Sequence, residues 1–126
     1  IYPTAILTQV KDIKKANNKF IKKKSNFLIS IKEQDSNALR SLVILPNNKL
    51  RFKWPNYIKK QSQNLKKYYQ DSGNFFILKT DYFIKYGFNQ KNVTYYEINK
   101  LSSVDINLKE DFIIAKRLYS NKNRII

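Results

Sequence analysis

The 126-residue chain contains no cysteine, no histidine and no methionine, and it has only two glycines. The absence of cysteine excludes disulfides and thiolate metal sites, and the absence of histidine removes the commonest metal ligand and acid–base group. Any metal ion must therefore bind to oxygen, which favours Mg²⁺, Mn²⁺ or Ca²⁺. Gly73 and Gly87 are too few for a glycine-rich loop that cradles a triphosphate.

Long hydrophobic runs are also missing. No apolar stretch approaches the ~18 residues of a transmembrane helix, and Ile1-Tyr2-Pro3 does not open a signal peptide. We therefore expect a cytoplasmic protein without membrane contacts. The hydrophobic content of 42% argues against disorder, and the length suits one domain with a core, residues 1–126. Because the chain lacks methionine and begins in what reads as the end of a strand, we expect a fragment.

Acidic residues are scarce, which gives a net charge of +16. Clustered lysines neutralise phosphates, so one interpretation is a nucleic-acid-binding module. However, Lys outnumbers Arg 21 to 4, and Asn occurs 15 times, which indicates a compositional bias. Proteins that recognise nucleic acids usually rely on Arg for bidentate contacts with phosphates and bases. The nucleic-acid interpretation is therefore the less favoured one. A basic cleft for small anionic substrates would also suit this charge.

The hydrophobic pattern predicts an alternation of helices and strands. A helix beginning near Val10, with Thr8 as its cap, places Ile13, Ala16 and Phe20 on the same face as Val10, and its lysines form a solvated face. The predicted strands are 26–31, 74–79 and 93–98. A hairpin is predicted to pair 39–45 with 49–54. Two further helices are predicted, 80–86, which ends at Gly87, and 108–119. Residues 32–37 and 55–70 are expected as loops, the second with a short helix. The tail, 120–126, is expected to fray. The fold class is α/β with an antiparallel insertion.

The segment between the last strand and the last helix carries the best candidate for chemistry. Asp105 lies at this crossing, where α/β proteins tend to bind ligands. Asn107 is a suitable N-cap for an amphipathic helix, and Glu110 stands where a capping-box partner belongs. Taken alone, Asp105 could equally do no more than end the strand.

Several segments resemble the acylneuraminate cytidylyltransferases, and they follow one another along the chain in the order that the family has. The stretch 102–112 and the start of the helix after it resemble S-x-D-I-D-T-x-x-D-F-x-x-A, with Asp105 at the first Asp and Asn107 at the second. The matching segments before it are 1–8 (similar to L-Q-P-T-S-P-L-R-T, and to I-Y-A-T-A-P of the pseudaminate branch), 10–16, 27–31 (S-V-V-S-V), 49–57 (G-R-L-x-x-x-W-P-E-Y), 62–65 (S-Q-D-L) and 69–76 (Y-x-D-x-G-x-F-Y).

The resemblance implies a Rossmann-like nucleotidyltransferase sandwich, of which this chain would be the C-terminal part. It implies transfer of CMP from CTP to a nonulosonic acid of the sialic, pseudaminic or legionaminic type, with release of pyrophosphate, for surface glycan biosynthesis. Residues 40–70 would be an inserted hairpin region that makes a homodimer contact, with Phe52, Trp54 and Tyr57 as anchors. These aromatics could equally form the core of the hairpin.

Site residues follow from the same resemblance. Asp105 would be catalytic and would hold Mg²⁺ together with Asn107, which binds it more weakly than the family's Asp. The substrate-binding residues would be Tyr2, Arg40, Ser62, Gln63 and Asp71. Without the resemblance, Arg40 reads as a surface residue and 62–64 as a polar turn.

The chain also departs from the family. Gln61 stands where the family has an Arg that contacts the sugar carboxylate, although Lys59 and Lys60 are close by. Asn64 and Asn107 replace two Asp residues, and no segment matches the family's triphosphate loop. Two alternatives to an inactive enzyme fragment therefore stay open, which are a degenerate non-catalytic relative and the nucleic-acid-binding module.

Overall fold

The computed structural model describes residues 1–34, 37–88 and 92–122. They fall into two compact units. One, the sheet unit, consists of Ile1–Lys32 and Asp71–Ile126, and the other, the hairpin unit, is Glu33–Gln70. The hairpin unit is thus inserted between two parts of the sheet unit.

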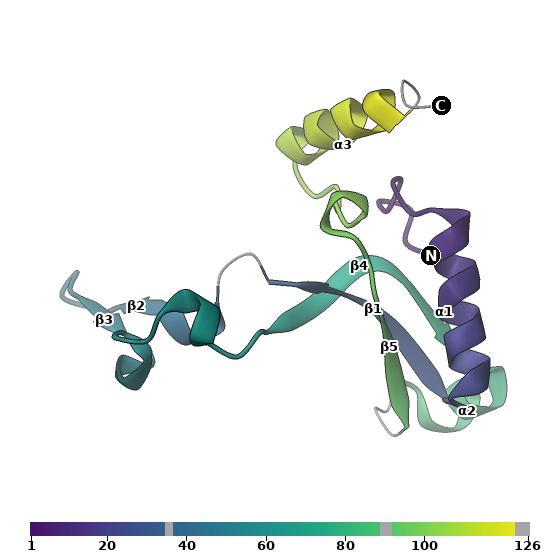
Figure 1. The fold of residues 1–126 in the computed structure, drawn as a ribbon, viewed down its shortest axis with the longest axis horizontal. Helices are drawn as coiled ribbons and strands as arrows, with labels where there is room; N and C mark the ends of the chain where they lie inside the picture. The colour runs from purple at the N-terminus through teal and green to yellow at the C-terminus, as the bar shows by residue number, and fades with distance from the viewer. Residues whose placement is uncertain (35–36, 89–91, 123–126) are drawn as a thin grey trace. The chain divides into compact units, whose positions relative to one another are not determined.

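The sheet unit contains a mixed sheet of three strands (Figure 1). Their order in the sheet is β4 (Tyr69–Leu78), β1 (Phe27–Glu33), β5 (Val93–Glu97). β1 and β5 are parallel, with Phe27 opposite Val93. Two hydrogen bonds show that β4 runs antiparallel to β1. Gln34 N–H donates to Tyr68 C=O beside one end of the pair, and Lys79 N–H donates to Asn26 C=O beside the other. The predicted α/β class is confirmed at this level. β4 begins five residues before the predicted start at Asn74, and β1 extends through Glu33 into the predicted loop.

Helix α1 (Val10–Lys22) covers the core of the sheet unit. Ala16 is buried with Leu28, Phe75 and Ile98, and Ile13 and Phe20 pack against this cluster. The predicted helical face is confirmed except at Val10, the first helical residue, which is 67% exposed.

The predicted cap of α1 is wrong. The N-cap position belongs to Gln9, and the Thr8 hydroxyl instead accepts a hydrogen bond from Asn74 Nδ2 at 2.8 Å. Helix α2 (Thr80–Tyr86) ends at Gly87 as predicted, with φ +60° at that glycine. Its N-cap position is Lys79, whereas the sequence favours Thr80 or Asp81 as the cap.

Helix α3 (Lys109–Lys122) differs from its prediction in three ways. It ends at Lys122 and not at residue 119, so residues 120–122, which were expected to fray, are helical. Ala115 is fully buried, but Phe112, Ile113 and Tyr119 are each about half exposed, so the predicted apolar face is not a buried face. The helix also begins one residue late. Asp111 therefore occupies the capping-box position expected for Glu110, and its carboxylate accepts from the backbone N–H groups of Asn107 and Leu108. The last four residues, 123–126, lie outside the described part of the chain.

The hairpin unit contains the predicted hairpin. β2 (Leu42–Ile44) pairs antiparallel with β3 (Leu50–Phe52), and Leu42 lies opposite Phe52. Three short 3₁₀ turns complete the unit, at Ala38–Arg40, Pro55–Tyr57 and Ser62–Asn64. Among the described helices of the whole chain, none is long and apolar enough to span a bilayer.

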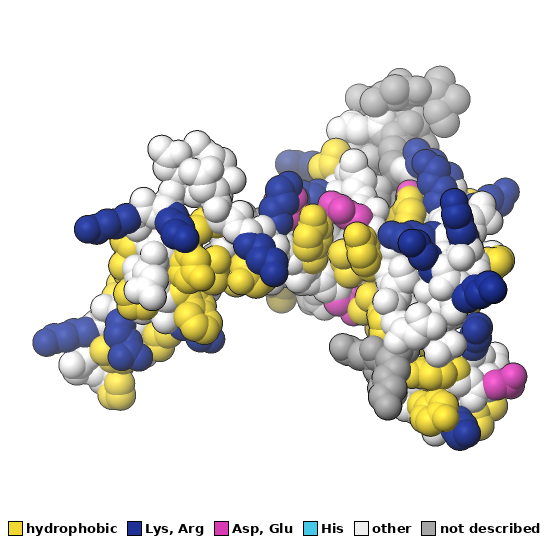
Figure 2. Space-filling model, turned by 60° about the horizontal axis from the view of Figure 1, so that its bottom comes forward, with side chains coloured by type: hydrophobic (Ala, Val, Ile, Leu, Met, Phe, Trp, Pro, Cys, Tyr) yellow, Lys and Arg dark blue, Asp and Glu magenta, His cyan; other side chains and the backbone are white. Residues whose placement is uncertain are grey.

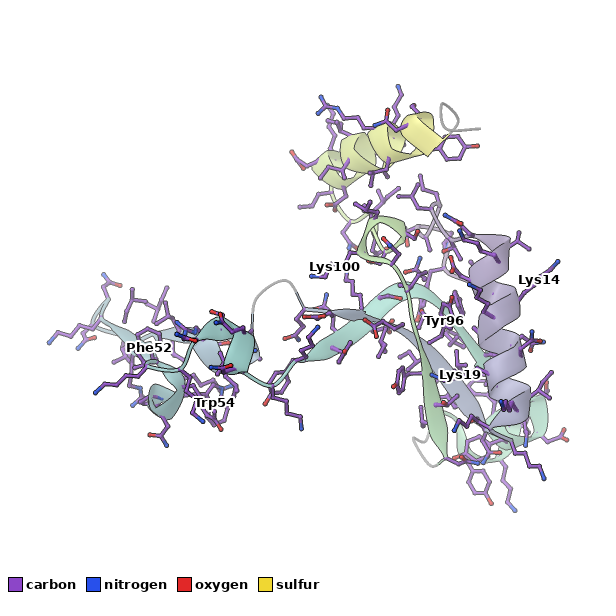
Figure 3. The ribbon with its side chains drawn as sticks, in the orientation of Figure 1. Lys14, Lys19, Phe52, Trp54, Tyr96 and Lys100 are labelled. Atoms are coloured by element: carbon purple, nitrogen blue, oxygen red, sulfur yellow. The ribbon has the colours of Figure 1, made fainter. Side chains whose placement is uncertain are left out.

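A tyrosine–carboxylate contact joins α1 to β5 and gives the fold a pH dependence. Tyr96 lies between β5 and α1 (Figure 3), and its hydroxyl donates to Asp12 Oδ1 at 2.9 Å. Burial, and then the hydrogen bond and charge of Asp12, raise the pKa of Tyr96 to about 12 from an ordinary value of 10.0. The fold therefore favours the neutral phenol, and this contribution to stability is present below pH 10 and lost between pH 10 and about 12.

We expect Tyr96→Phe to lose less stability than wild type over that pH range, because the variant has no phenol to ionise at this position. Urea midpoints followed by circular dichroism at pH 9 and near pH 12 measure the difference. Tyr95→Phe, on the exposed side of the same strand, should keep the wild-type decline. A decline in Tyr96→Phe equal to that of wild type would contradict the assignment.

Candidate functional site

The candidate site in the sheet unit begins with an irregularity in β4. The Ser30 hydroxyl donates to Phe75 C=O at 2.7 Å and accepts from Phe75 N–H at 3.0 Å. The buried Ser72 hydroxyl donates to Ser30 Oγ at 2.8 Å. A side chain from β1 thus satisfies both backbone groups of one β4 residue. Next to it, Gly73 has φ +68°, a conformation that glycine adopts far more readily than other residues.

Asp71 and Asp105 both lie against Gly73, and Asn107 contacts Asp105; we refer to these three residues as the carboxylate cluster. Asp71 Oδ1 accepts from Gly73 N–H at 2.9 Å. A Cβ atom on Gly73 would lie 3.2 Å from both Cγ and Oδ2 of Asp105, so the carboxylate packs closely against the glycine and would have to shift to admit a larger residue. Asn107 Nδ2 donates to Asp105 Oδ2 at 3.1 Å. Two segments that are far apart in the sequence, 71–73 and 105–107, therefore form one polar site.

Buried hydrogen bonds hold the loop that carries Asp105. Asn74 is 1% exposed, and its Nδ2 donates to Ser102 C=O and to the Thr8 hydroxyl, both at 2.8 Å. Lys32 Nζ donates to Ser103 C=O at 3.1 Å. The backbone just before Asp105 is thus held from two strands, by Asn74 of β4 and Lys32 of β1, and Asn74 is itself bonded to the segment before α1.

Tyr2 lies at the edge of this arrangement. Its backbone N–H donates to Asn74 C=O at 3.0 Å, and its ring packs edge-to-face on Phe76, with 5.9 Å between ring centroids. The structure thus places Tyr2 beside the strand that carries Gly73, as a neighbour of the cluster through Asn74.

The remaining predicted site residues lie together in the hairpin unit. Arg40, Ser62 and Gln63 line one hollow of about 470 Å³. The other lining residues are Glu33, Gln34, Asn37, Leu65 and Lys67. Gln63 Nε2 donates to Gln61 Oε1 at 3.0 Å, and the Arg40 guanidinium donates to Lys60 C=O. The lining contains two basic residues, and Lys67 forms a salt bridge of 2.9 Å with Glu33, so Arg40 is the one of the two without a carboxylate partner among the described residues. We call this hollow the Arg40 pocket.

The aromatic residues of the hairpin unit are only partly covered. Trp54 (Figure 3) is 44% exposed, with Lys53 Nζ 5.5 Å from its ring centroid. Lys60 Nζ lies 5.1 Å from the centroid of the Tyr57 ring. Trp54 also borders a second hollow of about 400 Å³ with Leu42 and Tyr68. The predicted interface role and the predicted core role of these aromatics both stay predictions.

The carboxylate cluster can be compared with what Mg²⁺ requires. Within the described residues, no group of three Asp, Glu, His or Cys side chains could enclose a metal ion. Mg²⁺ is, however, usually held by one or two carboxylates together with water and substrate phosphates. Asp105, with Asp71 close to the same glycine and the Asn107 amide in contact, fits that kind of site. Asn107 would offer Oδ1 after a rotation of its amide, because its Nδ2 now faces Asp105.

Sequence reasoning missed Ser30, Lys32 and Asn74. Ser30 gave a signal, since it is the one polar residue in the apolar run 27–31. Asn74 sits within the quoted Y-x-D-x-G-x-F-Y match but at an unspecified position, and Lys32 follows the strand as one lysine among many. Comparison with known proteins adds no assignment, because no protein family matches the sequence and no curated protein matches it.

Proposed function

We propose that this chain supplies the sugar-acid and Mg²⁺-binding part of a cytidylyltransferase of the acylneuraminate type, built on a Rossmann-like nucleotidyltransferase sandwich. The observation that carries the proposal is that Asp71 and Asp105 both lie against Gly73, with Asn107 hydrogen-bonded to Asp105. These residues belong to two separate segments that resemble that family. A mixed sheet with α1 packed against it is compatible with the proposed sandwich.

In the proposed reaction the anomeric hydroxyl of a nonulosonic acid forms a bond to the α-phosphorus of CTP and releases its proton to water. The bond from that phosphorus to the bridging oxygen breaks, so that pyrophosphate leaves. Bound Mg²⁺ would neutralise phosphate charge and polarise the hydroxyl. Asp105 supplies the anionic ligand for that ion. The other contributions of the chain are to position the two substrates and to neutralise their negative charges.

The Arg40 pocket is the proposed site for the sugar acid. A guanidinium binds a carboxylate through two parallel hydrogen bonds, and Arg40 is placed where it lines the hollow. Ser62 and Gln63 offer hydrogen-bonding groups for sugar hydroxyls on the same wall. The partly exposed Trp54 is the proposed anchor of a homodimer contact.

Metal binding tests the cluster on the 126-residue chain itself. We expect substoichiometric Mn²⁺, used as a paramagnetic probe, to broaden the amide NMR signals of Gly73 and Asn107. Asp105→Asn should weaken the binding at least about tenfold, because the anionic ligand is lost, and Asn107→Asp should strengthen it by about tenfold, because a second charge is added.

Asp81→Asn, which removes a carboxylate from α2, is the matched control and should leave the broadening unchanged. Broadening that persists in Asp105→Asn, or that follows Asp81 instead, would remove the cluster as a metal site. Turnover is tested on the product of the complete reading frame, by pyrophosphate release from CTP with each nonulosonic acid in turn. No release with any of them would overturn the proposed activity.

A non-catalytic relative is the second candidate, and the neutral residues at Gln61, Asn64 and Asn107 favour it. The Asn107→Asp variant separates the two candidates in the complete product. Increased turnover in that variant indicates a weakened but working site. Absence of turnover in both proteins, together with intact sugar-acid binding in the Arg40 pocket, indicates a protein that binds without catalysing.

A further inference from the structure

The strongest feature outside the carboxylate cluster and the Arg40 pocket is the charge on α1 and the residues that follow it. Residues 11–24 contain seven of the chain's 25 basic residues and one of its nine acidic ones. They are Lys11, Lys14, Lys15, Lys19, Lys22, Lys23 and Lys24, and we call them the lysine face. One-ninth of the chain thus carries more than a third of its net charge, which a uniform compositional bias does not explain.

The structure leaves this charge uncompensated and exposed. Apart from Lys19, which is partly covered, the seven lysines are exposed, and Figure 2 shows dark blue side chains along the part of the molecule formed by α1. Lys14 projects from α1 away from the sheet (Figure 3). Within the described residues, none of the seven forms a salt bridge. The one acid, Asp12, is engaged by the Tyr96 hydroxyl on the side of the helix that packs on β5.

We infer that the lysine face binds the phosphate backbone of a nucleic acid without reading its sequence. Eleven residues separate Lys11 from Lys22, which at ~1.5 Å per residue is about 16 Å along the helix. One strand of a duplex presents a phosphate every ~3.4 Å, so this length faces about four or five phosphates. Lysine is a flexible point charge, and arginine, the usual reader of bases, does not occur in residues 11–24.

A membrane surface fits these residues less well. A helix that binds lipid buries an apolar face between the headgroups. On α1 that face is already used, because Ile13, Ala16 and Phe20 pack into the core of the sheet unit. Next to the lysines, Tyr95 is 51% exposed with Lys19 Nζ 4.0 Å from its ring centroid, which adds an aromatic surface on which a base can stack.

The test is fluorescence anisotropy of a labelled oligo(dT) of about 20 nucleotides, longer than the usual site of ~4–16 nucleotides. At about 50 mM salt we expect a Kd within about 1–100 µM, and a slope of log K against log salt near about −3 for four engaged lysines. Lys14→Gln with Lys15→Gln should lower the affinity about tenfold and reduce the slope by about 1.4.

Lys116→Gln with Arg117→Gln is the matched control, since it removes two adjacent positive charges from the exposed surface of another helix. We expect it to change the affinity less than about twofold. Equal losses in the two double variants would show that only net charge matters, and absence of binding at low salt would show that the face is merely solvated. Binding to vesicles that contain anionic lipid, without binding to oligo(dT) or duplex DNA, would assign the face to membranes. Each of these three results overturns the inference.

Discussion

Ser30→Ala is expected to lower the free energy of unfolding by about 2–4 kcal/mol, although it removes a single oxygen atom. That oxygen bonds both the N–H and the C=O of Phe75 and accepts from the Ser72 hydroxyl. Phe75 is 2% exposed and Ser72 equally so, which means that water cannot replace the lost partner. A buried polar group left without a partner costs about 1–3 kcal/mol, and here three groups are affected at once.

Urea unfolding followed by circular dichroism measures the loss. Ser41→Ala is the matched control, because the Ser41 hydroxyl makes one local hydrogen bond to Ala38 C=O on the exposed surface. It should cost no more than about 0.5 kcal/mol, as surface substitutions usually do. Equal effects of the two substitutions would mean that Ser30 does not replace a backbone partner of β4. A large loss for Ser30→Ala alone would show that one hydroxyl maintains the path of the strand that carries Gly73.

Gly73→Ala is the second large effect, expected at about 2 kcal/mol. The left-handed conformation at φ +68° costs an L-residue about 1–2 kcal/mol. The added methyl group would also meet the Asp105 carboxylate at 3.2 Å, so that side chain must move by a few tenths of an ångström. The substitution should therefore change stability and the position of Asp105 together. Urea unfolding and the carboxyl ¹³C signal of Asp105 report the two changes.

Gly87→Ala separates backbone strain from contact. Gly87 also has a positive φ, but within the described residues nothing lies within 4 Å of a Cβ added there. It should lose stability while the Asp105 signal stays at its wild-type position. A shift of that signal in both variants would mean that strain alone disturbs the site, and no shift in Gly73→Ala would mean that the carboxylate is not held against the glycine.

The sequence predicted those helices and strands that depend on residues close together in the chain. The period of apolar residues located α1, the turn residues located the hairpin, and Gly87 marked the end of α2. The early part of β4 was missed because Tyr69 and Gln70 fall at the end of the predicted loop 55–70, and residues 71–73 were assigned to no element. Its strand geometry depends in part on Ser30, 42 residues earlier in the chain, and no local pattern carries that information.

For the candidate site, too, local patterns were predictable and long-range contacts were not. The residue types that suit a metal could be recognised from the segments around Asp71 and Asp105. Their approach to Gly73 could not, since it requires a positive φ in one segment and two long-range hydrogen bonds, from Lys32 to Ser103 C=O and from Asn74 to Ser102 C=O, to hold the other. For α3, the apolar pattern predicted a helix but contained no information on what would cover it.

The insertion of the hairpin unit affects how the chain folds. Neighbouring antiparallel strands such as β1 and β4 can be joined by a two-residue turn, whereas here residues 34–68 lie between them. Closing a loop costs about 0.6 kcal/mol for each doubling of its length, so a disordered insertion would oppose this pairing by roughly 2–3 kcal/mol. The hydrogen bond from Gln34 to Tyr68 brings the two ends of the insertion together. If residues 34–68 fold first, most of that entropy is already lost before β4 meets β1, and the segment that forms the Arg40 pocket also accelerates assembly of the sheet.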